Sequence, residues 1–155
     1  MTEDELIKKT LEESKTIAMV GVSSIKKEML TNIRRRPSTI VMKYMQEFGY
    51  KVIPVNPFSA GERIHGEIIV AKLSDVRIPI DIVDVFRPSK ATPPIAEEAV
   101  KIGAKVFWLQ YGIQNDEAKK IVESKNIAYI SNKCIKQEYQ RLFLKISPVF
   151  PALKN

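Results

Sequence analysis

Short apolar runs alternate with helical segments along most of this chain, and this alternation limits the fold more than any other feature. The apolar runs are 16–20, 51–55, 81–86, 105–109 and 127–130. Each run is short and largely apolar along its length, which indicates a strand that is buried on both faces of a sheet. Parallel strands of one sheet need a long crossover between them, and the intervening segments can supply it as helices.

The segments between the runs carry the periodicity and the end signals of helices. The expected helices are an N-terminal one within 1–14, then 37–48, 89–102, one capped by Asn115, and one that begins near Ile135. We expect Thr92 to cap the helix over 89–102, with Pro93 in its first turn and Gly103 at its end. The stretch 59–66 has little periodicity and is expected to be a loop. Together these elements predict an α/β fold, a Rossmann-like doubly wound parallel sheet of about five strands in three αβα layers.

The composition fits a single domain spanning 1–155. The chain has 155 residues and 45% apolar side chains, enough for a sizeable core. No stretch approaches the roughly 18 consecutive apolar residues of a membrane span, and the N-terminus is acidic where a secretory signal would be basic. Cys134 is the only cysteine, which excludes an internal disulfide and a thiolate zinc site. We therefore expect a soluble cytoplasmic protein that does not contact a membrane.

The positive charge of the chain is concentrated in one segment. The net charge is +7, and residues 25–36 contain five Lys or Arg side chains and one Glu. Such an excess favours an anionic partner. A nucleic acid is disfavoured, because the segment lacks interleaved aromatic residues and the strand pattern matches no common nucleic-acid-binding module.

Ligands of doubly wound sheets bind beyond the carboxyl ends of the strands, so the residues there form the candidate site. The first run is followed by Gly21, Val22, Ser23 and Ser24. Here the glycine lets the backbone approach a phosphate, and the serines can donate hydrogen bonds to it. The chain has neither the full glycine fingerprint of dinucleotide-binding folds nor a P-loop.

The next strand ends add polar, aromatic and basic side chains. The second run ends at Asn56 and Pro57, where an NAD site would place an acidic residue, and NAD is accordingly disfavoured. The third ends in Val85, Phe86 and Arg87, which offer an aromatic face for adenine and a guanidinium for phosphate. Taken singly, Phe86 also fits a core aromatic residue and Arg87 a solvated charge. Their coincidence at one edge of the sheet favours a nucleotide site.

Together, these strand ends resemble a known family. The elements are Gly21-Val22-Ser23, Arg36-Pro37-Ser38, Pro54-Val55-Asn56-Pro57, Asp84-Val85-Phe86-Arg87 and Trp108-Leu109-Gln110-Tyr111-Gly112. In this order they look like the CoA-binding protein family of small bacterial and archaeal proteins, over about 16–142. That family is similar to the CoA-binding domain of the succinyl-CoA synthetase alpha subunit, which has a five-stranded Rossmann-like fold.

The resemblance implies a coenzyme A site. It would place the loop 21–24 at the diphosphate, Asn56 and Pro57 beside the adenosine, and 85–87 around the adenine and phosphate. Gln110 would lie near the start of the pantetheine path.

The implied binding set also includes Arg36 and Ser38, which flank Pro37 after a basic insertion. Members of the family commonly have a shorter link than the one here, so 25–36 is an insertion. It is either a flap that contacts CoA phosphates or an unrelated surface segment.

The sequence shows no catalytic set. Asp81 and Asp84 have odd spacing, so a strand sends them to opposite faces, and we expect structural roles for both. His65 has no evident partner. Cys134 opens the last helix and is either an inert core thiol or one that could form a mixed disulfide with the CoA thiol.

The sequence therefore predicts a non-catalytic protein that binds coenzyme A or an acyl-CoA through its ADP moiety. Two alternatives stay open: a component of an acyl-CoA enzyme that needs a partner domain, and a generic adenine-nucleotide binder. A protein partner or a homo-oligomer is also open.

Overall fold

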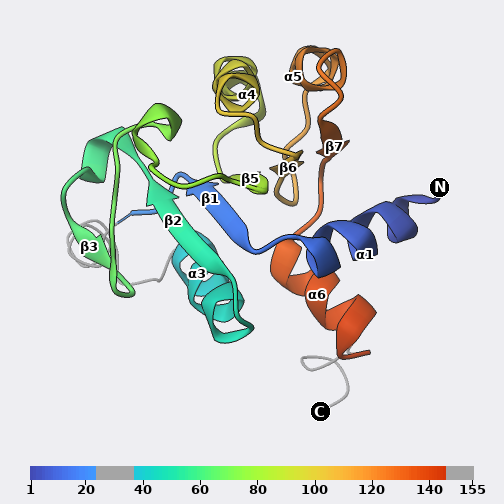
Figure 1. Cartoon of the computed structure of the whole chain (residues 1–155), viewed down its shortest axis with the longest axis horizontal. Helices are drawn as coiled ribbons and strands as arrows, with labels where there is room; N and C mark the ends of the chain where they lie inside the picture. Colours follow the sequence, from blue (N-terminus) through green and yellow to red (C-terminus); the bar gives the residue numbers. More distant parts are fainter. Residues whose placement is uncertain (24–36, 146–155) are drawn as a thin grey trace.

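A parallel sheet forms the centre of the molecule, with helices on both of its faces (Figure 1). The computed structural model describes residues 1–23 and 37–145. The strands of the sheet are β1 Thr16–Val20, β2 Lys51–Val55, β5 Ile82–Val85, β6 Val106–Leu109 and β7 Ala128–Ile130. The helices are α1 Glu3–Glu13, α3 Pro37–Glu47, α4 Thr92–Lys101, α5 Asp116–Glu123 and α6 Ile135–Phe143. Shorter elements are β3 Arg63–Ile64, β4 Glu67–Ile68, and the 3₁₀ turns η1 Pro57–Ser59, η2 Leu73–Asp75 and η3 Ser89–Ala91.

The order of the strands identifies the place where the winding of the chain reverses. Among the described residues, the sheet has the order β2-β1-β5-β6-β7, and neighbouring strands are parallel. From β1 the chain moves outward to β2 and then returns past β1 to β5. The topological switch point therefore lies between β1 and β5. The predicted α/β, Rossmann-like fold with five parallel strands is confirmed.

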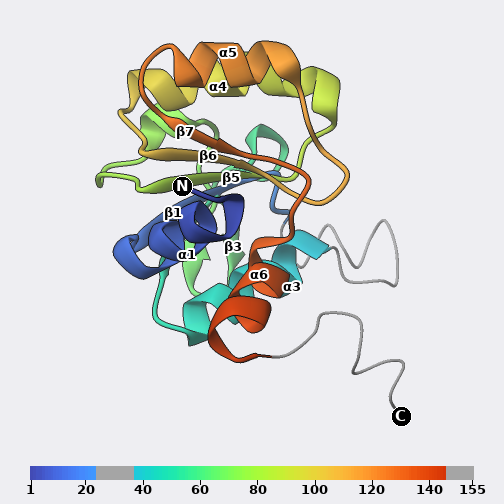
Figure 2. The same cartoon turned by 90° about the vertical axis from the view of Figure 1, so that its right-hand side faces the viewer.

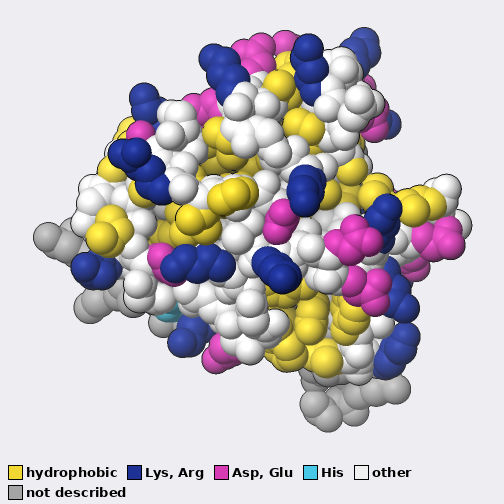
Figure 3. Space-filling model, viewed as in Figure 1, with side chains coloured by type: hydrophobic (Ala, Val, Ile, Leu, Met, Phe, Trp, Pro, Cys, Tyr) yellow, Lys and Arg dark blue, Asp and Glu magenta, His cyan; other side chains and the backbone are white. Residues whose placement is uncertain are grey.

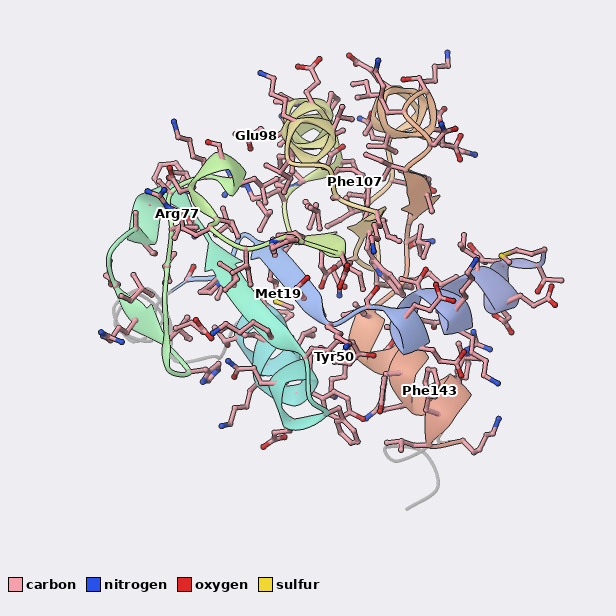
Figure 4. The ribbon with its side chains drawn as sticks, viewed as in Figure 1. Met19, Tyr50, Arg77, Glu98, Phe107 and Phe143 are labelled. Atoms are coloured by element: carbon pink, nitrogen blue, oxygen red, sulfur yellow. The ribbon has the colours of Figure 1, made fainter. Side chains whose placement is uncertain are left out.

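The two faces of the sheet bury separate apolar cores, because side chains alternate along each strand. Helices α1, α3 and α6 cover the face that carries Ile17, Met19 and Trp108. Helices α4 and α5 cover the other face, which carries Ala18 and Phe107. Figure 2 shows the sheet between these two helical layers, and Figure 4 shows Met19 and Phe107 on opposite sides of it.

The starts of two helices test the predicted caps. Asn115 caps α5 as expected, since its side chain accepts a hydrogen bond from the Ala118 amide at 2.8 Å. The cap predicted at Thr92 is wrong: Thr92 is the first residue of α4, and its hydroxyl donates to the Ser89 carbonyl at 2.7 Å. A cap accepts from the second or third amide of a helix. Thr92 lies inside α4, and Ala91 holds the N-cap position, where no side chain makes a cap hydrogen bond.

The stretch expected to be a loop over 59–66 contains part of a small hairpin. Strands β3 and β4 pair antiparallel, and the turn between them is His65-Gly66, with φ of 47° and 82°. Two successive positive φ values are typical of a type I′ turn. The His65 Nε2 atom lies 3.0 Å from the Thr39 carbonyl oxygen of α3, which ties the hairpin to that helix.

Asp81 has the structural role that its spacing suggested. One of its carboxylate oxygens accepts hydrogen bonds from the Lys15 amide at 2.8 Å and from the Thr16 amide at 3.2 Å. Partial burial opposes ionisation, but these amides and the Thr16 hydroxyl outweigh it and hold the pKa of Asp81 below its ordinary value. Asp81 therefore links the start of β1 to the start of β5.

Replacing Asp81 by Ala is expected to lower the free energy of unfolding at neutral pH by about 1–3 kcal/mol, because two backbone amides lose their acceptor. The wild-type advantage is complete above the unfolded-state pKa, whose ordinary value is 3.8, and disappears as pH falls through the lower folded-state pKa. Urea unfolding at several pH values measures both effects. Asp81→Asn is the control, because it keeps an acceptor oxygen and should lose less stability. If the loss in free energy of unfolding of Asp81→Ala did not change in acid, the result would contradict this account.

Candidate functional site

The strands β1 and β5 meet most closely at Gly21, immediately after β1. Gly21 has φ of 107°, and a Cβ placed there would lie 3.0 Å from the Phe86 carbonyl oxygen and 3.2 Å from the Phe86 Cβ. The Gly21 amide donates to the Val55 carbonyl at 2.8 Å, and the Phe86 amide donates to the Val20 carbonyl at 2.8 Å. Glycine is therefore required for the ends of β1, β2 and β5 to converge at the switch point.

Asn56 holds two loops together behind this edge. Its side chain is buried, donates to the Val22 carbonyl at 3.1 Å and accepts from the Phe58 amide at 2.9 Å. The loop after β1 is thus fixed against the turn after β2. Asn56 contributes to the site by positioning the backbone, and its contact with an adenosine stays a prediction.

A first pocket, here called the α4 pocket, opens between the ends of β1, β2 and β5 and helix α4. It has a volume of about 350 Å³. Gly21, Pro57 and Arg87 line it, together with Lys72 and Glu98. Figure 4 shows Glu98 on α4. The Arg87 guanidinium carbon lies 5.9 Å from the centre of the Phe58 ring, and this cation–π contact orients it beside the pocket.

A second pocket, here called the α6 pocket, lies on the other side of the same edge, between the end of β6, the start of α3 and helix α6. It has a volume of about 550 Å³. The lining residues are Pro37, Val41, Phe86, Gln110, Tyr111, Ile113, Cys134 and Gln137.

The residues predicted from the strand ends are divided between the two pockets. Phe86 and Arg87 are neighbours in an extended segment, so their side chains leave it on opposite sides. Phe86 and Gln110 line the α6 pocket, whereas Gly21, Pro57 and Arg87 line the α4 pocket. Val85 is fully buried in the core and lines neither pocket.

The other predicted residues lie behind the pockets or outside the described residues. Val22, Ser23 and Ser38 are buried, with exposed fractions of 0%, 7% and 3%. Ser24, Arg36 and the basic insertion over 25–36 lie outside the described residues, so their contacts with a ligand stay predictions.

Sequence reasoning missed Lys72, which lines the α4 pocket. It reaches the pocket because Val70 pairs with Val55 in an isolated parallel bridge, and Asn56 donates its amide to the Val70 carbonyl at 2.8 Å. The signal in the sequence is the apolar run 68–70, which continues the pattern of the strands but is too short to stand out.

Asp84 is a buried carboxyl in the central part of the sheet. It is fully buried in register with Met19 and Trp108, and within the described chain neither carboxyl oxygen has a hydrogen-bond partner. Burial raises the pKa of Asp84 well above its ordinary value. The carboxyl therefore stays neutral over a range of pH in which an exposed Asp is ionised.

Lys, Arg, Asp and Glu side chains are interspersed on the face of the molecule that is turned to the viewer in Figure 3. That face carries no continuous basic stripe of the kind that tracks a nucleic acid. Over 1–23 and 37–145, no cluster of three His, Cys, Asp or Glu side chains is arranged to hold a metal ion. The same ranges contain no helix with the length and apolar character of a membrane span.

Comparison with known proteins identifies the family. A family model described as a CoA binding domain matches residues 15–140. The chain belongs to this CoA-binding domain family. The uncharacterized protein YneT of Bacillus subtilis is 42% identical over 130 residues, which cover 84% of this chain and 89% of that protein.

Solved structures share the fold of this chain. A Thermus thermophilus protein superposes with a TM-score of 0.81 and 35% identity, over 92% of this chain and 100% of that one. A hypothetical protein from Pyrococcus horikoshii gives a TM-score of 0.81 and 36% identity, over 91% of this chain and 92% of that one. A dinucleotide forming acetyl-coenzyme A synthetase of Korarchaeum cryptofilum shares the fold over 76% of this chain and 26% of its own, with a TM-score of 0.59 and 21% identity.

Gly21→Ala is expected to destabilise the domain more than Gly49→Ala, by about 1–3 kcal/mol. Both glycines have positive φ, 107° and 97°, so both variants carry backbone strain, but a Cβ at Gly49 meets nothing within 4 Å. The excess loss at Gly21 measures the contact with Phe86. Urea unfolding of both variants tests this, and equal losses would contradict the close approach.

Asp84→Asn should become more stable relative to wild type as pH rises above 3.8, the ordinary value for Asp. Above that pH the unfolded chain releases the Asp84 proton while the folded chain retains it, so wild type loses about 1.4 kcal/mol per pH unit until the folded-state pKa is reached. The difference in free energy of unfolding, followed from acid to neutral pH, measures this slope. A constant difference would show that Asp84 ionises normally in the fold.

Proposed function

We propose that this chain binds coenzyme A or an acyl-CoA at the carboxyl edge of its sheet and does not itself catalyse a reaction. The observation that carries the proposal is that Gly21, Pro57 and Arg87 line one pocket at the switch point, where doubly wound sheets bind nucleotides. Membership of the CoA-binding domain family supports coenzyme A as the nucleotide.

The lining of the α4 pocket matches the chemistry of a nucleotide. Val20, Val55 and Ile95 supply apolar surface on which a purine can lie. Lys72 and Arg87 supply positive charge for phosphates, and a guanidinium can bind two phosphate oxygens at once. Gly21 lines the same pocket, so its backbone can lie beside a diphosphate.

Binding without chemistry is supported by what the pockets contain. Among the described lining residues, the α4 pocket offers Lys72, Arg87 and Glu98 as charged groups, and the α6 pocket has Cys134 as its thiol. Among the described residues, neither set pairs a nucleophile with a hydrogen-bonded base, which is a common arrangement for nucleophilic catalysis.

Arg87→Ala is expected to weaken the binding of coenzyme A by about tenfold to a hundredfold, because a charge-assisted hydrogen bond contributes about 1.5–3 kcal/mol. Isothermal titration calorimetry of the wild type and the variant measures the change. Arg77→Ala is the matched control, since it removes the same charge from an exposed side chain that lines neither pocket. Unchanged affinity in Arg87→Ala would remove Arg87 from the proposed site.

The same titration identifies the ligand class when ATP and NAD replace coenzyme A. We expect coenzyme A to bind most tightly and NAD to bind weakest. Equal affinities for coenzyme A and ATP would reduce the proposal to a general adenine-nucleotide site. Binding of NAD alone would overturn it.

A further inference from the structure

The α6 pocket contains a polar group that has no partner among residues 1–23 and 37–145. Gln110 is only 5% exposed and lines this pocket. Its Oε1 atom accepts a hydrogen bond from the Ile135 amide at 3.2 Å, at the start of α6. In the described part of the chain, its Nε2 group has no acceptor. Since the oxygen side of the amide is fixed by Ile135, the amide donors are the part of Gln110 available to an occupant of the pocket.

The thiol of Cys134 lies in the same pocket. Cys134 is the N-cap residue of α6, yet its side chain makes no cap hydrogen bond, and it is partly exposed. Its carbonyl accepts from the Glu138 amide at 2.9 Å, so the backbone that carries the thiol is held by the first turn of the helix. Cys134 therefore stands on backbone that the helix holds, is partly exposed and shares the pocket with the Gln110 amide.

The rest of the α6 pocket suits a slender arm with amide groups. Pro37, Val41 and Ile113 give it apolar walls, and the unpaired amide of Gln110 can donate to a carbonyl oxygen of such an arm. Phe86 lines the α6 pocket and the next residue, Arg87, lines the α4 pocket, so the two pockets lie on either side of one short stretch of backbone. A ligand with its nucleotide in the α4 pocket therefore has to cross only this stretch to bring a thiol-bearing arm toward Cys134.

We propose that Cys134 is a thiol–disulfide exchange site. Its substrate is the disulfide of a thiol-bearing nucleotide, such as coenzyme A disulfide. This rests on the proposed function, since the nucleotide is taken to occupy the α4 pocket. Gln110 positions the arm by donating a hydrogen bond to it.

The exchange is balanced without a further oxidant. The deprotonated sulfur of Cys134 attacks one sulfur of the bound disulfide, a bond forms between the two, and the ligand disulfide bond breaks. The other half leaves as a thiolate and takes up the proton that Cys134 released. The sulfur of Cys134 is oxidised, the departing sulfur is reduced, and the product is a mixed disulfide between the protein and one nucleotide thiol.

Intact-mass spectrometry under non-reducing conditions follows the reaction of the reduced full chain with coenzyme A disulfide or with glutathione disulfide. Because Cys134 is the only cysteine, each adduct reports on that residue. We expect the coenzyme A adduct to form at least roughly tenfold faster at equal concentration, because the bound nucleotide holds the two sulfurs near each other. We also expect desulfo-coenzyme A, which has no sulfur, to slow this adduct but not the glutathione adduct.

Gln110→Glu tests the positioning role. It keeps an oxygen for the Ile135 amide and removes the amide donors, so the ratio of the coenzyme A adduct rate to the glutathione adduct rate should fall several-fold. The ratio cancels the effect of the new carboxylate on the ionisation of the thiol, which slows both adducts. Gln114→Glu is the matched control, because it makes the same change on an exposed side chain outside the pocket. The desulfo-coenzyme A competition with wild type decides the question even where Gln110→Glu does not fold.

Calorimetry with desulfo-coenzyme A separates this inference from the proposed function. Tight binding of desulfo-coenzyme A together with equal adduct rates for the two disulfides would overturn the exchange site and leave the binding function in place. The absence of an adduct would do the same and would make Cys134 an inert core thiol. No binding of desulfo-coenzyme A would overturn both.

Discussion

The approach of Gly21 to Phe86 is the constraint on which the rest of the site depends. At this point three parallel strands end within hydrogen-bonding distance of one another, because the Gly21 amide reaches the Val55 carbonyl and the Phe86 amide reaches the Val20 carbonyl. A side chain at Gly21 would press against the Phe86 backbone. Residues at this point line both pockets, Gly21 the α4 pocket and Phe86 the α6 pocket.

The fold could be predicted from the sequence because its signals are local. Runs such as 105–109 are apolar and bounded, and glycines and caps such as Asn115 mark where the helices stop and start. The misses have a common origin in contacts that local patterns do not encode. The hairpin at His65-Gly66 has a histidine with positive φ whose ring lies against α3, and Thr92 is already helical because the turn η3 leads directly into α4.

The candidate site could be predicted from the sequence only in part, for the same reason. The sequence placed Gly21, Asn56, Phe86, Arg87 and Gln110 at the correct strand ends, but it could not show that Phe86 and Arg87 face different pockets. It also could not show that the pKa values of Asp81 and Asp84 differ from each other. These two residues stand three positions apart, yet one carboxylate is surrounded by amide donors and the other by the apolar core, so their pKa values move in opposite directions.

The peptide bond between Phe86 and Arg87 belongs to the walls of both pockets. One side chain faces α6 and the next faces α4, so the partition between the pockets is a single stretch of backbone. A shift of this stretch that accommodates an occupant in one pocket also changes the wall of the other pocket. A molecule long enough to fill both pockets would therefore contact both sides of this stretch, whereas a fragment that fills one pocket would contact one side only.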